Sequence, residues 1–419
     1  MLTWSIVAAL VLVSFAAIHA LCALVVLRWR GSHVDHLPPD FQPRVAVVLS
    51  IRGRDPSLAD TVRGLLAQHY DRYEVHMVVD HRSDPAWAEL SQLLQREDVC
   101  RRARLHELQS PPPHCGLKCA ALVQAIRGLP PVEIVATIDA DVIPHPHWLT
   151  TLIAPLADPQ IGVVTGNHWF EPVQANGGSL LRSLWNAGAL VPTSVFANPW
   201  AGTAAFRLEE IHRTGLLDLW ERSAVDDGPV RRAIATLGKR IHFVPGLLMI
   251  NREACSLQYF LRYVVRILTW SRVYEPSFWF TVAHATVNLS AWGAVALLGL
   301  LALIRRDAGA TVCATAGLLL HAGGLWLAFL IVRHGVSRMV ETRGDRLPRM
   351  PRAVATTTFL LTPVAFLLHG YGVLRALTTR AICWRGIWYR IAGPGAVVRT
   401  GYAPLREETP SATSSQHSI

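Results

Sequence analysis

The sequence predicts an α/β domain with a mostly parallel mixed sheet, joined to transmembrane helices, and two observations carry this prediction. Between about residues 41 and 276, short continuous apolar runs alternate with segments of helical periodicity. That alternation is typical of parallel strands that are buried on both faces and linked by helices. Outside this region, the chain contains apolar runs that are long enough to cross a bilayer as helices.

The first apolar run covers residues 1–27 and contains no charged side chain. We expect a retained anchor over residues 1–30, because a removable signal peptide would have a charged start and a shorter apolar core. Arg28 and Arg30 follow the run. Positive charge beside a first helix favours the cytoplasmic side for the next segment, so the central domain is predicted to be cytosolic.

Residues 40–255 are predicted to form the α/β domain, which opens with the buried strand 45–51. Ligands of such sheets bind beyond the carboxyl ends of the strands, so the residues after each strand are the first candidates for a site. The later elements follow in alternation, with strands at 75–79, 105–108 and 134–138 and helices at 58–66, 85–94 and 117–126.

Residues 256–277 are predicted to form an amphipathic interfacial helix, since arginines alternate there with aromatic residues just before an apolar run. A simple anchor and an active-site lid are both open as its role. The C-terminal transmembrane helices are predicted within 278–375, as apolar runs at 278–304, 308–332 and 353–374 with a basic loop at 333–352 before the last.

The basic tail, residues 376–419, raises a conflict over membrane topology. Three crossings after a cytosolic domain would place it outside, whereas the six arginines from Arg375 to Arg406 precede the first acid, Glu407, and favour the cytoplasmic side. Either the charge rule fails here or the segment around Pro363 is re-entrant, and we favour a cytosolic tail. The polar end, 409–419, is expected to be disordered.

The composition excludes several classes of protein. Hydrophobic residues make up 51% of the 419 and charged residues 17%, which is too apolar for an ordinary soluble or disordered chain. The seven cysteines include no CxxC pair, so neither a zinc site nor a thioredoxin-like site is indicated. A net charge of +10 is compatible with nucleic acid, but much of the basic excess flanks apolar runs, so we expect no nucleic-acid partner.

The sharpest candidate for chemistry is Asp139-Ala140-Asp141, which follows the strand 134–138 directly. Two carboxylates at this spacing can present hard oxygen ligands to Mn²⁺ or Mg²⁺, and the metal can in turn hold a diphosphate. An isolated Asp-x-Asp motif is weak evidence, because chance often produces it. Its place after a buried strand favours a metal site over a solvated turn.

Three further carboxylates follow the first two strands. Asp55 lies after 45–51, and Asp80 and Asp84 lie after 75–79. They could accept hydrogen bonds from a nucleobase or a ribose. Helix capping is an equal alternative, because Asp before Pro is a common helix start.

Lys118 is one of only two lysines, and it stands in the first turn of the helix 117–126, where backbone donors and an ammonium suit a phosphate. Gly202 lies in a run of small residues, which permits either close approach of a ligand to the backbone or a tight strand crossing. Asp226 and Asp227 precede a helical run. One of them could cap that helix and the other could act as a general base.

Taken in order, these features resemble a known family of enzymes, glycosyltransferase family 2, and are most similar to ceramide glucosyltransferase and its bacterial membrane relatives. The similarity covers about residues 40–280. Thr269 departs from the pattern, because the family motif has a second basic residue there. The tail segment 383–390 also resembles a segment that follows the spans in such enzymes. The matching residues are Asp84 before Pro85, Asp139-Ala140-Asp141, the run 200–206, Asp226-Asp227, and Arg266 followed by Trp270.

The resemblance implies a GT-A fold and inverting transfer of a sugar from a nucleotide sugar, with a UDP-linked donor expected. It implies that Asp80 or Asp84 contacts the nucleotide, that Asp139 and Asp141 bind Mn²⁺ or Mg²⁺, and that Asp227 is the catalytic base. The predicted substrate-binding set is completed by Asp55, Lys118, Gly202, Asp226, Arg266 and Trp270.

The anchor and the interfacial helix imply that the acceptor is a membrane lipid, which is glycosylated at the cytosolic face. The sequence does not decide among ceramide, diacylglycerol, hopanoid and polyprenyl lipids. One alternative is a polysaccharide synthase, for which four spans are few to enclose a polar channel. Another is a non-catalytic membrane protein that binds a nucleotide sugar, which Thr269 suggests. The excess of arginine over lysine favours a GC-rich bacterial genome, and therefore the bacterial inner membrane as location.

Overall fold

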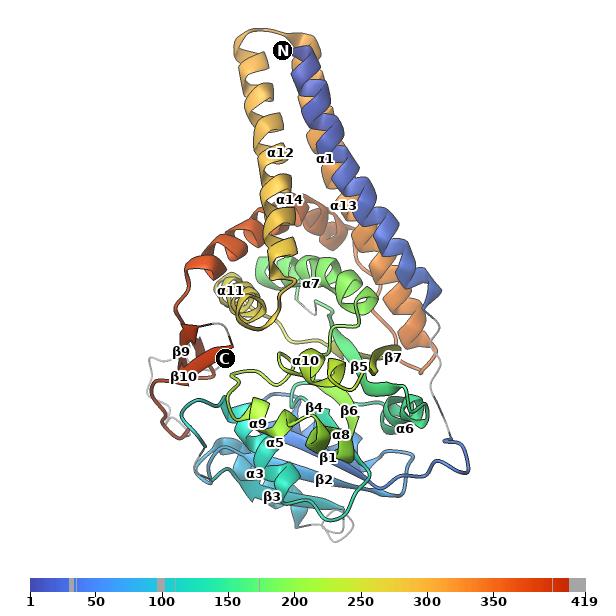
Figure 1. The fold of residues 1–419 in the computed structure, drawn as a ribbon. Coiled ribbons are helices and arrows are strands. Elements are labelled where there is room, and N and C mark those ends of the chain that lie inside the picture. The colour runs from blue at the N-terminus through green and yellow to red at the C-terminus, as the bar shows by residue number, and fades with distance from the viewer. Residues whose placement is uncertain are drawn as a thin grey trace. The chain divides into compact units, whose positions relative to one another are not determined.

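The structure is a computed structural model, and it describes residues 1–29, 34, 36–95, 102–109, 111–172, 174–393 and 395–406. The chain divides into two compact units, each built from three separate stretches of sequence. One, the helical unit, comprises Met1–Gly31, Trp169–Pro192 and Arg252–Thr378, and the other, the sheet unit, comprises Ser32–His168, Thr193–Asn251 and Thr379–Ile419. Figure 1 shows the elements of both units.

The main sheet of the described residues contains seven strands in the order β3-β2-β1-β4-β6-β5-β7. The first four strands are parallel, and β6 runs antiparallel to both β4 and β5. The predicted fold class, a mostly parallel mixed α/β sheet, is therefore confirmed. The strands are β1 (Val45–Ile51), β2 (Tyr73–Val79), β3 (Ala103–Glu107), β4 (Ile134–Ile138), β5 (Ile161–Phe170), β6 (Thr203–Arg207) and β7 (Arg240–Asn251).

The central strands form because their side chains are apolar on both faces. All five residues of β4 are buried, as are six of the seven in β1, and the register pairs Val47 with Val75 of β2 and with Ala136 of β4. The connecting helices are α2 (Leu58–Leu66), α3 (Pro85–Leu94), α5 (Leu117–Arg127), α6 (Trp148–Ile153), α8 (Leu208–Arg213), α9 (Leu216–Trp220) and α10 (Val230–Ala235).

The strand order creates a switch point between β1 and β4. From β1 the chain moves outward to β2 and β3, and it then returns to place β4 on the other side of β1. Ligands of open α/β sheets bind at the carboxyl ends of the strands beside such a point. The carboxyl edge of the sheet therefore positions the candidate site.

The helical unit contains α1 (Leu2–Ala23), continued by a 3₁₀ turn to Arg28, and α12 (Phe278–Ile304), α13 (Ala308–Glu341) and α14 (Arg352–Thr378). Among the described residues, these four helices are long and apolar enough to cross a membrane. The segment predicted at 256–277 contains a helix, α11 (Leu257–Tyr274), and α7 (Gly177–Val195) begins in the same unit.

The basic loop predicted at 333–352 is wrong in its first part, because α13 continues as a helix to Glu341. The extension is stabilised at Arg333, whose guanidinium donates to Glu171 at 2.7 Å and to the carbonyl oxygen of Pro348 at 2.6 Å. The charged side chain of Arg333 ends the apolar run, but the helix continues past it because Arg333 has hydrogen-bond partners.

Two different packing patterns hold the long helices. Helix α1 packs closely along α13, because Gly317 and Gly324 face Ala9 and Ala16 so tightly that an added Cβ would lie 2.7 Å from each alanine Cβ. Small residues permit this close approach of apolar helices. Helix α14 packs instead on α11, where Gly372 faces Val264. In Figure 1, α1, α12 and α13 run alongside one another.

The tail forms structure that the sequence did not indicate. Strands β8 (Ala381–Trp384), β9 (Ile387–Gly393) and β10 (Ala396–Arg399) make an antiparallel sheet in the sheet unit. A two-residue turn joins β8 to β9, and both Arg385 (φ 47°) and Gly386 (φ 75°) have the positive φ that such a hairpin requires. The predicted disordered end, 409–419, and Arg30 lie outside the described residues.

Candidate functional site

Lys118 is the centre of the candidate site. Its ammonium lies 2.5 Å from a carboxylate oxygen of Asp139 and 2.7 Å from one of Asp226. The Lys118 side chain is 16% exposed and that of Asp226 only 5%. Three residues that the sequence singled out separately are thus brought together in one partly buried charge cluster, beside the carboxyl end of β4.

The start of α5 explains why Lys118 meets Asp226. Gly116 is the N-cap residue of this helix, and a Cβ there would lie 2.2 Å from the carbonyl oxygen of Ala224. Its backbone N–H donates to the carbonyl oxygen of Ser223 at 2.8 Å. Only glycine allows this contact, which holds the loop carrying Asp226 against the first turn of α5.

Gly202 fixes the other side of the cluster. It precedes β6, whose pairing with β4 places Thr203 opposite Ile138, and its carbonyl oxygen accepts from the N–H of Asp139 at 3.1 Å. A Cβ on Gly202 would lie 2.3 Å from Asp139 Oδ2 and from the ring of Trp200. The run of small residues therefore makes room for the Asp139 carboxylate.

A Gly202→Ala variant is expected to lower kcat/KM by about 10²-fold, because displacing a positioned group by about 1 Å has effects of that size. The matched control is Gly188→Ala, since nothing lies within 4 Å of a Cβ added on Gly188. Initial rates of both variants check this. Wild-type rates in Gly202→Ala would show that the position of the Asp139 carboxylate does not matter.

Asp227 is half-buried beside Asp226 in a loop with internal hydrogen bonds. Trp220 Nε1 donates to the carbonyl oxygen of Asp226 at 2.7 Å, and Ser223 Oγ donates to that of Val225 at 2.6 Å. Burial, and then the negative charge of Asp226, raise the pKa of Asp227 to about 7. A carboxylate with a pKa in this range is suited to accept a proton near neutral pH.

The neighbouring charges have shifted pKa values as well. Burial would lower the pKa of Lys118, but Asp139 and Asp226 raise it above its ordinary value. Burial also raises the pKa of Asp226, against the opposing effect of Lys118. The ammonium therefore stays charged, and it serves as the counter-ion of both carboxylates.

A second group of predicted residues lies at the carboxyl ends of β1 and β2. The buried carboxylate of Asp80 forms an ion pair with Arg52, and its Oδ1 has no hydrogen-bond partner among the described residues. Arg52, the partner of Asp80, was not among the residues predicted from the sequence. Its signal was available, because it follows β1 directly, as Asp80 follows β2.

Asp84 and Asp55 have structural partners. Asp84 Oδ1 accepts from the N–H of Ala86 at 2.9 Å, which caps α3, and Oδ2 accepts from the N–H of Gly53 at 2.8 Å. The capping alternative therefore describes Asp84. Both oxygens of Asp55 accept from the guanidinium of Arg385, at 3.0 Å each.

Asp139 and Asp141 supply the carboxylates of the predicted metal site. Within the ranges that the structure describes, no group of three or more His, Cys, Asp or Glu residues is arranged to hold a metal. Mg²⁺ commonly takes one or two carboxylates, with phosphate and water as its other ligands. The two aspartates at the end of β4 suit a metal held in that way, with Asp139 now paired to Lys118 and Asp141 partly exposed.

Arg266 and Trp270 lie on α11 in the helical unit, whereas the predicted carboxylates lie in the sheet unit. Between them, Thr269 is fully buried, and its hydroxyl donates to the carbonyl oxygen of Val265 at 2.6 Å. Threonine at this position packs within its own unit, where a basic side chain would be buried.

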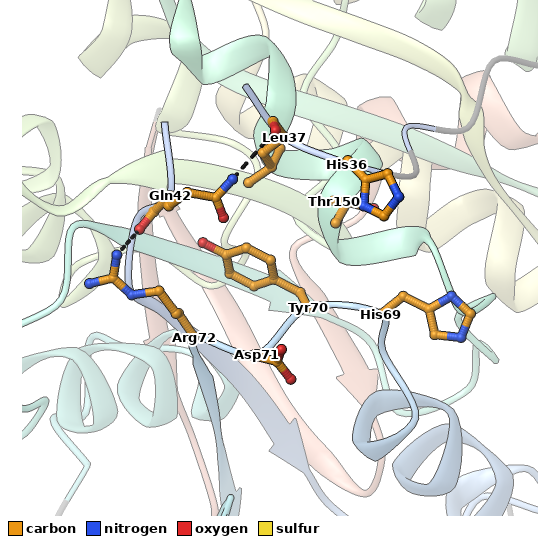
Figure 2. A pocket seen from close by; sticks show the side chains of 8 residues that line it. All are labelled: His36, Leu37, Gln42, His69, Tyr70, Asp71, Arg72 and Thr150. Carbon is orange, nitrogen blue, oxygen red and sulfur yellow. Dashed lines mark hydrogen bonds between the residues drawn. The ribbon is translucent and has the colours of Figure 1, made fainter. Parts of the chain in front are cut away.

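A pocket of about 310 Å³ lies elsewhere in the sheet unit. Figure 2 shows it near the amino ends of β1 and β2, the edge opposite the one that carries Asp80 and Asp139. It is therefore not part of the candidate site. Its lining residues are His36, Leu37, Gln42, His69, Tyr70, Asp71, Arg72 and Thr150.

Comparisons with known proteins bear on the fold and the family. The family model described as glycosyl transferase family 21 matches residues 7–397. This match supports the prediction of a glycosyltransferase. The family that it indicates is family 21, whereas the motifs resembled family 2. No curated protein matches the sequence.

Three solved structures illustrate what the chain resembles. The mannosyltransferase PcManGT from Pyrobaculum calidifontis, in complex with GDP-Man and Mn²⁺, is 19% identical with a TM-score of 0.46, over 88% of this chain and 98% of that one. Glucosyl-3-phosphoglycerate synthase from Mycobacterium tuberculosis, in complex with Mn²⁺, UDP-glucose and phosphoglyceric acid, is 19% identical with a TM-score of 0.34, over 54% and 79%. S. aureus TarS 1–349 is 12% identical with a TM-score of 0.36, over 86% and 100%. At these scores, the likenesses assign neither a donor nor an acceptor to this chain.

Proposed function

We propose, from the premise that this chain belongs to glycosyl transferase family 21, that it transfers a sugar with inversion from a UDP-linked donor to the hydroxyl of a membrane lipid. The observation that carries the proposal is the charge cluster at the carboxyl edge of the sheet, where Lys118 joins Asp139 to Asp226 and Asp227 follows directly. A cation and an ionisable base at one sheet edge are what transfer from a nucleoside diphosphate requires.

In this proposal, Lys118 stabilises the charge that develops on the leaving diphosphate. Positioned charges aimed at a developing anion are usually the largest contribution to catalysis. Lys118 is partly buried and held by two carboxylates, so it needs little rearrangement when the donor arrives. Asp80, whose buried Oδ1 has no hydrogen-bond partner in the part of the chain that the structure describes, is proposed to bind the nucleoside.

Asp227 is the proposed general base. It accepts the proton of the acceptor hydroxyl as the oxygen attacks the anomeric carbon from the face opposite the leaving group, which inverts the configuration. A raised pKa near 7 supports this role, because a large fraction of the base is then ionised at neutral pH and still takes up a proton readily. No second carboxylate is needed, because the leaving nucleoside diphosphate is already an anion.

Asp139 and Asp141 are the residues proposed to hold Mn²⁺ or Mg²⁺ together with the donor diphosphate. When bound, the metal would neutralise the negative charge of the diphosphate. Gly202 supports this arrangement, because it leaves the space in which the Asp139 carboxylate lies.

A lipid acceptor is supported by the four apolar helices and by α11, which carries aromatic and arginine side chains. A polysaccharide synthase would need enough spans to enclose a polar channel, and the described helices offer few for one chain. The test uses a radiolabelled nucleotide sugar with membranes. One discrete product in the organic phase supports a lipid acceptor, and a ladder of water-soluble products would refute it.

The tail supports a specific topology, with the sheet unit and the tail both cytosolic. Strands β8–β10 pack within the sheet unit, for example through the pair of Arg385 and Asp55, so the tail must lie on the same membrane side as that unit. An even number of crossings therefore separates Asn251 from Thr379. Since α12, α13 and α14 are three candidate spans, one of them does not cross.

Helix α14 is the one proposed to lie in the interface. It packs mainly on amphipathic α11, contains Pro363 and is the least apolar of the four candidate spans. Helices α1, α12 and α13 pack on one another, and Arg305 at the turn between α12 and α13 approaches Met1 at 3.5 Å. Met1 and this turn are then on the far side of the membrane from the tail.

Labelling of single cysteines in intact cells with a membrane-impermeant maleimide checks this topology. In a background without other cysteines, the native exposed Cys383 and an Asp71→Cys variant are expected to react only after permeabilisation, and Arg305→Cys to react without it. Reaction of Cys383 together with the α12–α13 turn would mean that α14 crosses the membrane.

A further inference from the structure

The C-terminal residues 381–393 and 395–406, here called the strap, are attached to the loop after β1. The tip of the hairpin supplies Arg385, whose Nη2 binds both oxygens of Asp55 at 3.0 Å and whose Nη1 donates to the carbonyl oxygen of Arg52 at 2.5 Å. In return, Arg52 Nε donates to the carbonyl oxygen of Arg385 at 2.9 Å. The two arginines thus exchange hydrogen bonds across more than 300 residues of sequence.

The middle of the strap is attached to the segment after β3 and to the start of α5. The N–H of Arg399 donates to the carbonyl oxygen of Pro113 at 2.7 Å, and its guanidinium donates to that of Pro111, also at 2.7 Å. The hydroxyl of Tyr389 accepts from the N–H of Leu117 at 3.4 Å. The strap therefore reaches the helix that carries Lys118.

The end of the strap reaches the residues after β2. The hydroxyl of Tyr402 donates to the carbonyl oxygen of Asp80 at 3.5 Å, and the hydroxyl of Ser83 donates to the carbonyl oxygen of Leu405 at 3.3 Å. Arg52 Nη2 donates to the carbonyl oxygen of Ala403 at 2.9 Å. The contacts of the strap thus follow the carboxyl ends of β1, β2 and β3, which are neighbours in the sheet.

We propose that the strap forms the outer wall of the donor-nucleotide site, and that the pair of Asp55 and Arg385 is the positioning contact that holds this wall in place. The inference rests on the proposed function, since it adds a wall to the donor site. The carboxyl edge is where a nucleotide binds in a sheet of this order, and the strap contacts that edge at the carbonyl oxygen of Asp80, whose buried Oδ1 has no hydrogen-bond partner within the described ranges.

Asp55 then acts through Arg385 and Arg52, and it does not touch the donor. The guanidinium of Arg52 has three acceptors, which are the Asp80 carboxylate and the carbonyl oxygens of Arg385 and Ala403. Two of these three belong to the strap. Release of the hairpin tip would free Arg52 and, with it, the Asp80 carboxylate, while the cluster around Lys118 stays intact.

The test compares the kinetics of Asp55→Asn and Arg385→Gln, which keep the shape of each side chain, with wild type. Each variant is expected to raise the donor KM about tenfold, since a hydrogen bond between charged groups contributes roughly that factor. The kcat at saturating donor and the KM of the lipid should stay within about twofold, because the catalytic cluster does not change. Lower kcat with an unchanged donor KM would overturn the proposal.

Arg390→Gln is the matched control. Arg390 lies on β9 of the same strap, but its side chain is exposed, so its removal should leave the donor KM unchanged. The double variant Asp55→Asn/Arg385→Gln should be no worse than either single variant, because the two side chains act as one pair. Additive effects in the double variant would show that the two residues act separately.

A second measurement needs no variant. Uridine diphosphate with Mn²⁺ is expected to slow trypsin cleavage of the strap after Arg390, and to leave cleavage after the exposed Arg349 of the helical unit unchanged. Equal cleavage of the strap with and without the nucleotide would overturn the proposal. A wild-type protein that neither binds nor turns over any nucleotide sugar would refute the proposed function instead, so the two failures are distinguishable.

Discussion

An Asp227→Asn variant is expected to bind the donor as wild type does and to turn over about 10²- to 10⁴-fold more slowly, which is the usual contribution of a positioned general base. Asparagine keeps the shape of the side chain but cannot accept the proton. Titration of the purified protein with nucleoside diphosphate measures binding, and release of nucleoside diphosphate measures turnover. Asp218→Asn is the matched control, because the side chain of Asp218 is 76% exposed and lies outside the cluster.

The pH dependence of the wild-type rate gives the same prediction a second readout. The pKa of Asp227 is about 7 in the folded protein, and the base works only when ionised. The value of kcat/KM should therefore rise with pH through about 7 and level off above it. The step should be absent from the residual activity of Asp227→Asn. A wild-type profile without this step, or full activity in the variant, would remove Asp227 from the role.

The second large effect is expected from Lys118→Met. Methionine removes the shared counter-ion of Asp139 and Asp226 and leaves two carboxylates close together in a partly buried site. Breaking a buried ion pair by removing one partner costs about 3–5 kcal/mol of folding free energy. Loss of a charge that stabilises the leaving group should also lower kcat by about 10²- to 10³-fold.

The chain provides a close control for this variant, since Lys239 is the only other lysine. Its side chain is 18% exposed, and it forms an ion pair with the buried Glu210, away from the site. Lys239→Met should lower the melting temperature to a smaller extent, because Glu210 keeps its ion pair with Arg207, while the folded fraction keeps its kcat. Thermal unfolding and rates measured at a temperature where both variants are folded separate the two effects. Equal loss of kcat in both variants would mean that Lys118 stabilises the fold and does not stabilise the leaving diphosphate.

Three elements of the sheet unit could be predicted from the sequence to the residue. The strands at 45–51 and 134–138 have the predicted bounds, as has the helix at 85–94, because continuous apolar runs and an Asp-Pro start leave little ambiguity. Lys118 could be singled out because lysine is so rare in this chain. Its partners could not be, because they come from the end of β4 and from a loop some hundred residues later.

The strap shows where sequence reasoning fails. Its strands are short and are bordered or interrupted by arginines, so the sequence shows no clear period there, and the strands form because they pair with one another in a small sheet. Asp55 was expected to contact the nucleotide, yet its partner Arg385 is 330 residues away in the sequence. The place of Arg52 directly after β1 was visible in the sequence, but two of its acceptors, at Arg385 and Ala403, lie more than 300 residues away and could not be predicted.

The most direct test of the central claim is nucleoside diphosphate release by the detergent-purified protein, measured with Mn²⁺, a panel of nucleotide sugars and a total lipid extract, beside Asp227→Asn. The account predicts release from one class of donor that requires the lipid extract and is lost in the variant. Absence of release with every donor, while nucleotide still binds, would contradict it and leave a protein that binds nucleotide sugars without transferring them.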